Sequence, residues 1–225
     1  MFEKMTFQNQ DEKDDFEKYR CLKGDDLYHQ IYRILIEKTD RVRYATVRAY
    51  IRYDKNLREK LYSYLATLEE YCKAQLLRFY DVKTSKKYEH HCYDKLMADL
   101  VEKEFDVSTL YYCLQPDFGD LMRVCQAKGI CEINDDDQKD IKDLRNKTMH
   151  HTLLLFGNVK NEKELYDHFS TLEKRLNSFA TALPQEYRKG FLSDIEKLNY
   201  NSAHNTKHLS KYYLDVQDGR ICVKK

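Results

Sequence analysis

Residues 57–80 read LREKLYSYLATLEEYCKAQLLRFY, without a Gly or a Pro. Apolar residues recur along this stretch at steps of three and four, at Leu57, Leu61, Leu65, Leu68, Cys72, Leu76 and Phe79. Such spacing places them on one face of an α-helix. We therefore predict a long helix over 57–80 that packs its apolar face into a core.

The rest of the chain favours the same kind of structure. Its 225 residues include two Pro and six Gly, too few for the many turns of a sandwich or barrel. We predict further helices over 93–102, from 106 or 108 to 115, over 117–129, 134–157 and 161–179, and from Pro184 to 198. Asp117, Asn134 and Asn161 are the expected N-caps. The sequence thus predicts an all-α fold in one domain spanning 1–225.

Both ends of the chain differ from this middle part. Residues 1–26 carry eight acids against five bases, and we expect a mobile or loosely docked lead-in there. Residues 199–225 are polar and support no firm assignment. No run of about 18 apolar residues is present, and the first residues lack a signal-peptide core, so we expect a cytoplasmic protein with no membrane contact.

A basic, Tyr-rich stretch covers residues 33–60, with nine bases against four acids. Such a composition suits an RNA backbone, with bases stacking on the rings of the interleaved tyrosines. Arg41, Arg43, Arg48 and Arg52 are the candidate RNA contacts. The alternative is a solvated helix face along which Arg stems lie on apolar surface.

Residues 143–151, DLRNKTMHH, are the candidate catalytic segment. On a helix Asn146 and His150 are i,i+4 neighbours, so the amide can orient the imidazole. Arg145 can hold a phosphate with its guanidinium fork, and Lys147 can add a further RNA contact. An imidazole can take or give a proton near neutral pH, so Arg145 and His150 together suffice for RNA cleavage without a metal.

One such segment supplies one firm acid–base group, and a symmetric dimer would bring a second copy to the same site. His151 is a weaker auxiliary candidate. The structural alternative is that Arg145 pairs with nearby acids and the two histidines cap or pack the helix. A chance Arg-x4-His match is common in such a composition, but Asn directly after the Arg lowers the expectation to about one in fifty.

The segment resembles the RNxxxH signature of HEPN-domain ribonucleases, and 145–151 is similar to the RNxxxHH form of their abortive-infection AbiD/AbiF-like branch. Residues 50–58, YIRYDKNLR, together with Glu69, resemble the YxxDxxLR…IE helix start of that branch. Residues 110–121, with Phe118-Gly119-Asp120-Leu121, resemble its LL-x-FG-x-L element. The three elements follow the family's order and cover about residues 50–157.

This resemblance implies a HEPN-like helical bundle with additional flanking helices, which pairs two RNxxxH helices across a homodimer. The implied activity is that of a metal-independent endoribonuclease in a bacterial anti-phage system, of the abortive-infection or toxin–antitoxin type. Arg145, Asn146 and His150 would then be catalytic. Besides RNA, the implied partners are an antitoxin or another protein of a defence complex.

No cofactor or metal site is predicted. His204 and His208 have a zinc-like spacing and His90-His91-Cys92 form a cluster, but neither has partners that complete four ligands. The seven Cys include no CxxC pair, which indicates reduced, mostly buried thiols. Two further functions stay open: a non-catalytic HEPN module that binds RNA or a protein partner, and a structural dimerisation domain.

Overall fold

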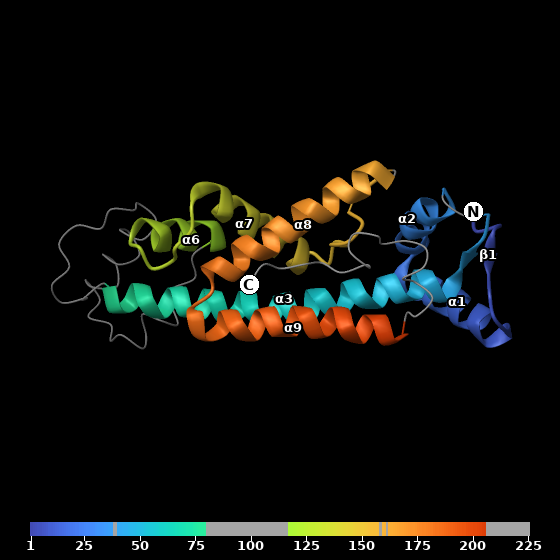
Figure 1. Cartoon of the computed structure of the whole chain (residues 1–225), viewed down its shortest axis with the longest axis horizontal. Helices are drawn as coiled ribbons and strands as arrows, with labels where there is room; N and C mark the ends of the chain where they lie inside the picture. Colours follow the sequence, from blue (N-terminus) through green and yellow to red (C-terminus); the bar gives the residue numbers. More distant parts are fainter. Residues whose placement is uncertain (38–39, 80–116, 158, 161, 206–225) are drawn as a thin grey trace. The chain divides into compact units, whose positions relative to one another are not determined.

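The computed structural model describes residues 1–37, 40–79, 117–157, 159–160 and 162–205 (Figure 1). These residues form seven helices and two short strands, in the order β1 Met5–Thr6, α1 Gln10–Lys23, α2 Asp25–Ile36, β2 Val42–Arg43, α3 Tyr44–Phe79, α6 Phe118–Ala127, α7 Asp135–Met149, α8 Glu162–Ala182 and α9 Gln185–Asn205. The predicted all-α class is confirmed, apart from the two strands. The helices predicted over 93–102 and 106–115, the cap Asn161 and the cluster at 90–92 lie outside the described residues.

The described chain is divided between two compact units. Unit 1 comprises Met1–Leu61, Lys147–Lys174 and the described residues from Leu192 onward. Unit 2 comprises the described parts of Tyr62–Asn146 together with Arg175–Phe191. Helices α3, α7, α8 and α9 therefore each contribute residues to both units.

In unit 1 the N-terminal segment, for which we expected a loosely docked lead-in, forms β1 and α1. Strand β1 pairs in parallel with β2, with Met5 opposite Val42. Phe16 of α1 is 3% exposed and meets Tyr28 of α2 and Tyr44 of α3 edge to face. Aromatic packing of this kind adds roughly 0.5–1.5 kcal/mol per pair beyond area burial, so α1 is fixed to the first turns of α3.

Helix α3 begins at Tyr44, well before the predicted start at Leu57. Tyr44, Val47, Ile51 and Leu57 are all buried, so one apolar stripe continues without a break into the predicted helix. From the sequence we described residues 33–60 by their bases and tyrosines, and we did not recognise the apolar stripe that runs between the bases. All predicted core positions from Leu57 to Leu76 are at most 1% exposed.

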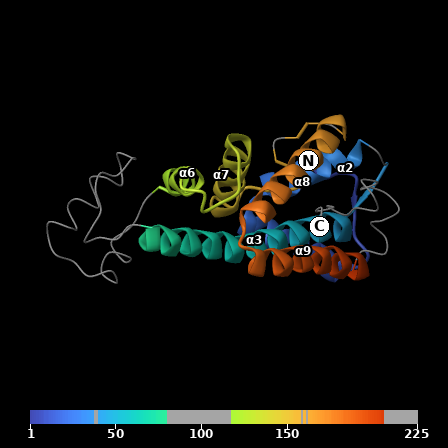
Figure 2. The same ribbon diagram turned by 60° about the vertical axis from the view of Figure 1, so that its left-hand side comes forward.

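Helix α9 begins directly after Pro184, as predicted, and runs antiparallel to α3 (Figures 1 and 2). In unit 1 Lys60 pairs with Asp194 at 3.2 Å. In unit 2 the ring of Tyr64 meets Phe191 edge to face at 5.2 Å. Tyr187, which we expected in the core, is 47% exposed.

In unit 2 the start of α7 contacts both α6 and α8. Gln138 of α7 donates to the Gly119 carbonyl of α6 at 3.3 Å. The Ser178 hydroxyl of α8 donates to Asp137 at 2.6 Å. Asp117 accepts from the Gly119 amide at 2.8 Å, which confirms it as the N-cap of α6. No helix within the described ranges is long and apolar enough to cross a membrane.

Candidate functional site

Helix α7 carries the first part of the candidate motif, and its start is fixed by a reciprocal cap. The Asn134 side chain accepts from the Asp137 amide at 2.8 Å, and Asp137 accepts from the Asn134 amide at 3.3 Å. Ile141, Leu144 and Thr148 are at most 2% exposed and lie on one face. The residues between them, Arg145 among them, therefore lie at the partly exposed flank of the helix.

The guanidinium of Arg145 has no carboxylate partner among the described residues. Its Cζ lies 5.7 Å from the Phe118 ring centroid, and its Nη1 donates to Asn146 Oδ1 at 3.4 Å. Its Nε is buried and has no hydrogen-bond partner within the described ranges. The nearby acids Asp140 and Asp143 instead face Arg175, at 3.6 and 3.0 Å. The alternative in which Arg145 is neutralised by its neighbouring acids is therefore not what the described structure contains.

The histidines follow at the end of α7, in a six-residue helix-capping turn. The Thr152 amide donates to the Lys147 carbonyl at 3.0 Å, and the His151 amide donates to the Thr148 carbonyl at 3.3 Å. These two bonds are the 6→1 and 5→2 bonds of a Schellman motif. His150 is therefore the C-cap residue, and His151 takes the left-handed position with φ of 54°.

This turn ends α7 at Met149, so the prediction that the helix continues to about Gly157 is wrong. The four residues Leu153, Leu154, Leu155 and Phe156 are all at most 6% exposed. Four consecutive side chains on a helix would point in four directions, and one face could bury only some of them. Turn structure over 151–157 buries them all, at the cost of a left-handed residue.

Asn146 was expected to orient His150. In the structure the Asn146 side-chain oxygen accepts from Arg145, so the amide faces the guanidinium next to it. The contact between Asn146 and His150 stays a prediction.

The buried segment after the histidines is held from α3 by Asp54, which is fully buried. Its Oδ1 accepts from the amides of Leu154 and Leu155 at 2.6 and 2.9 Å. Its Oδ2 accepts from Arg58 Nε at 2.8 Å. Burial raises the pKa of Asp54, while the Leu155 amide and the Arg58 guanidinium act against that rise.

The same segment is held from α8 by His168. Its Nε2 lies 2.6 Å from the Leu154 carbonyl oxygen. A carbonyl can only accept, so this nitrogen carries the proton. Gly157 lies close to the same ring: its φ is +44°, and a Cβ there would lie 2.8 Å from His168 Cε1.

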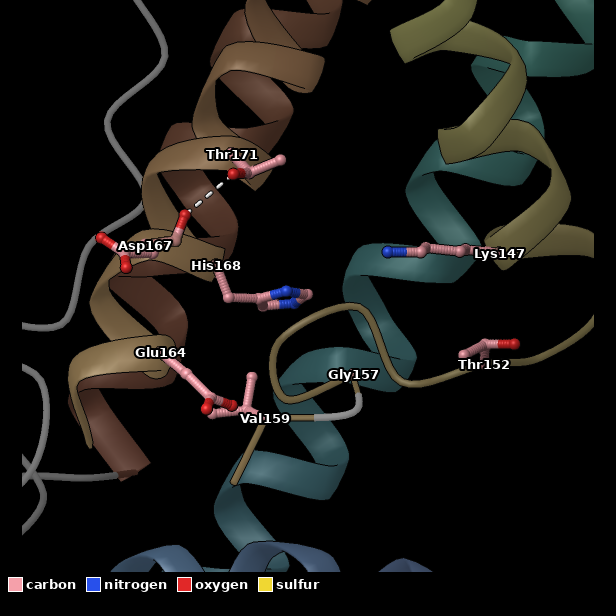
Figure 3. A pocket seen from close by; sticks show the side chains of 8 residues that line it. All are labelled: Lys147, Thr152, Gly157, Val159, Glu164, Asp167, His168 and Thr171. Atoms are coloured by element: carbon pink, nitrogen blue, oxygen red, sulfur yellow. Dashed lines mark hydrogen bonds between the residues drawn. The ribbon is translucent and has the colours of Figure 1, made fainter. Parts of the chain in front are cut away.

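A cavity of about 420 Å³ opens beside this ring in unit 1 (Figure 3). The side chains of Lys147 and His168 extend into it from opposite sides, from the end of α7 and from α8. It is also lined by Thr152, Gly157, Val159, Glu164, Asp167 and Thr171. A cation, an imidazole, two carboxylates and hydroxyls give this cavity hydrogen-bonding groups of both kinds.

The candidate RNA contacts of the basic stretch have different surroundings. Arg41, Arg43 and Arg52 are exposed. Arg48 is only partly exposed, because it pairs with Asp15 of α1 at 3.4 Å and lies over the Tyr44 ring. The interleaved rings of Tyr32, Tyr44 and Tyr50 are at most 6% exposed and belong to the core, so they offer no face for base stacking.

From the sequence we assigned no role at this site to Asp54 or His168, although Asp54 lies within residues 50–58, which we had singled out. Asp54 had a detectable signal, because it interrupts the apolar stripe of α3 one turn before Arg58. A carboxylate at such a position needs partners when buried. His168 had no comparable signal, since it lies beside the buried Phe169 on α8 without any motif around it.

Three free cysteines meet in the core of unit 2. Cys72 and Cys131 have their sulfurs 3.6 Å apart, and Cys125 donates toward the Cys72 carbonyl at 3.9 Å. Hydrogen bonds from the other two thiols, together with burial, raise the pKa of Cys72. Cys21 is free and exposed. No group of three or more His, Cys, Asp or Glu within the described ranges is arranged to hold a metal ion.

Comparisons with protein-family models, with curated proteins and with solved structures gave no match to this chain.

Proposed function

We propose that this protein is a metal-independent endoribonuclease of the HEPN type, belonging to a bacterial anti-phage system. The observation that carries the proposal is that Arg145, the first residue of the RNxxxHH motif, has no carboxylate partner among the described residues. Its guanidinium is partly exposed, is free of any carboxylate among the described residues, and has a buried Nε with an unused donor. A cation kept without an anionic partner is suited to a phosphate.

The proposed reaction divides the work between two side chains. The His150 imidazole takes the proton of the ribose 2′-hydroxyl or gives a proton to the leaving 5′-oxygen. Arg145 stabilises the charge that develops on the phosphorus oxygens in the transition state. Both steps together need a second acid–base group, which a second copy of the chain would supply across a homodimer.

Two features of unit 1 support RNA as the substrate. His150 is exposed at the end of its helix, where a large substrate can reach it. The cavity beside Lys147 has about 420 Å³, within the usual range of ligand sites at roughly 300–1,000 Å³. It is large enough to take a nucleotide that flanks the cleaved bond.

The test is RNA cleavage in excess chelator by wild type, His150→Ala and Arg145→Ala. The control is His29→Ala, a partly buried histidine far from the motif in sequence. We expect chelator-resistant cleavage by wild type and the control, and a loss of about 100-fold or more in the other two. Unchanged cleavage by purified His150→Ala would refute the proposal.

A composite site makes a further demand. A dimer of Arg145→Ala alone lacks the catalytic arginine, and a dimer of His150→Ala alone lacks the catalytic histidine. A mixed dimer of the two variants contains one intact arginine and one intact histidine. Refolding the two variants together should restore part of the activity if the two motif copies share a site. Light scattering should then give twice the chain mass of 27.2 kDa.

The second candidate is a non-catalytic module that binds RNA, and the exposure of Arg41, Arg43 and Arg52 favours it. It requires RNA affinity that falls steeply with salt, without cleavage. Binding with a salt slope but intact RNA after long incubation would select this reading over the ribonuclease.

A further inference from the structure

We infer that Asp54 and His168 are positioning residues that together hold the turn carrying His150 and His151. The inference rests on the proposed ribonuclease function for its catalytic consequence and on the described contacts for its geometry. Neither residue belongs to the RNxxxHH motif, and they come from different helices, α3 and α8.

The two residues hold Leu154 by both of its backbone polar groups, which belong to the peptide groups before and after it. The amide of Leu154 donates to Asp54 Oδ1 at 2.6 Å, while its carbonyl accepts from His168 Nε2 at 2.6 Å. The next amide, that of Leu155, donates to the same carboxylate oxygen at 2.9 Å. Residue 154 is three positions after His151, so a fixed peptide there leaves little freedom to the left-handed turn before it.

Each of the two residues is itself fixed. Asp54 is fully buried, and its second oxygen accepts from Arg58 one turn along the same helix. His168 has its ring close to the backbone of Gly157, where an added Cβ would lie 2.8 Å from the ring. Hydrogen bonds to a charged group are about twice as strong as neutral ones, so the carboxylate is the stronger of the two anchors.

The turn at His150 and His151 needs to be held from both sides. His151 sits at a left-handed φ that an L-residue adopts only when its surroundings enforce it. The Schellman bonds hold the turn from the side of α7, and Asp54 with His168 hold it from the other side. A catalytic imidazole displaced by about 1 Å loses on the order of 100-fold in rate, so this anchoring matters for chemistry.

The experiment uses the full chain and two pairs of variants. Asp54→Ala removes the acceptor of all three hydrogen bonds, whereas Asp54→Asn keeps an oxygen for the two amides. His168→Ala removes the donor to Leu154, whereas His168→Gln keeps an N–H at similar reach. Leu76→Ala in unit 2 is the control for loss of stability alone, since Leu76 is 1% exposed and its truncation leaves a cavity in the core.

Two readouts separate positioning from stability. Hydrogen exchange at the Leu154 and Leu155 amides, together with the imidazole NMR signals of His150, reports on the turn without any substrate. The values of kcat and KM for RNA report on catalysis. In both alanine variants we expect faster exchange at these amides, shifted His150 signals and a fall in kcat of about tenfold or more with little change in KM. In the Asn and Gln variants, the amide exchange, the His150 signals and kcat should return most of the way to their wild-type values. Leu76→Ala should leave all three unchanged.

The outcomes distinguish the two proposals. If the wild type cuts RNA and the kcat of the alanine variants equals that of wild type, or falls no further than the kcat of Leu76→Ala, the positioning role is overturned while the ribonuclease proposal stands. If the wild type does not cut RNA, the ribonuclease fails, and unchanged exchange and His150 signals in the alanine variants would overturn the anchoring of the turn as well. Loosened exchange with shifted His150 signals would uphold the anchoring in either case.

Discussion

His151 offers a direct test of the turn that ends α7, through the substitution His151→Gly. The residue has φ of 54° and an exposed side chain, so little packing is lost with the ring. A left-handed L-residue costs about 1–2 kcal/mol, and Gly removes that cost. Gly also makes the unfolded chain more flexible, which takes back about 0.4–1 kcal/mol.

The net expectation is a gain of about 0.5–1 kcal/mol in the free energy of unfolding. For a chain of this size that corresponds to a rise in Tm of about 1–4 °C. Urea unfolding followed by far-UV circular dichroism measures the free energy, and thermal melts measure Tm. His151→Ala is the matched control, because it removes the ring and keeps the Cβ that causes the strain, and its stability should stay within about 0.5 kcal/mol of wild type.

A His151→Gly variant no more stable than His151→Ala would refute the assignment of His151 to the left-handed position of the cap. A gain in stability together with a loss of RNA cleavage would have a different meaning. It would indicate that the imidazole is retained at a strained position because catalysis uses it, as is common where strain is stored at functional sites.

Three further expectations follow from the described contacts. Gly157→Ala should destabilise more than Gly129→Ala in urea unfolding, since both glycines have positive φ but only at Gly157 would the new Cβ collide, at 2.8 Å, with an imidazole ring; equal losses would contradict that contact. Arg41→Gln should lower the slope of log affinity for single-stranded RNA against log salt by about 0.7, whereas Arg48→Gln should change it little, because Arg48 is already paired with acids of α1. Burial raises the pKa of Asp54, so just above pH about 4 the folded carboxyl keeps a proton that the unfolded chain has released. The stability that this group adds is therefore complete below pH about 4 and is lost as pH rises through the pKa of the folded carboxyl. The unfolding free energy of wild type relative to Asp54→Asn should fall as pH rises, and a difference that stays constant with pH would contradict this sign.

The helices were predictable because their signals are local. The apolar stripe of residues 57–76 and the caps Asp117 and Asn134 depend on residues within one or two turns. The start of α3 was missed because buried tyrosines look polar in a sequence when bases surround them. The end of α7 was missed because His151 fills a position where Gly is the usual signal.

The candidate site divides in the same way. The motif at 145–151 is visible in the sequence, as is its chemistry. The absence of a carboxylate partner for Arg145 among the described residues was not predictable, since the neighbouring acids pair with Arg175, 32 residues from Asp143. Nor was the link between Asp54 and Leu154, which are 100 residues apart in the chain. Such contacts depend on the packed fold and leave no periodic signal.

The way the chain alternates between its two units limits how the protein can be taken apart. It passes from one unit to the other four times, and one passage falls between Asn146 and Lys147, inside the candidate motif. A single cut anywhere from Tyr62 to Phe191 therefore divides both units, and a cut at any bond of the chain divides unit 1. We expect no fragment to contain a complete unit 1, which carries His150, so domain-truncation libraries of this protein should yield insoluble or protease-sensitive products rather than a minimal catalytic core.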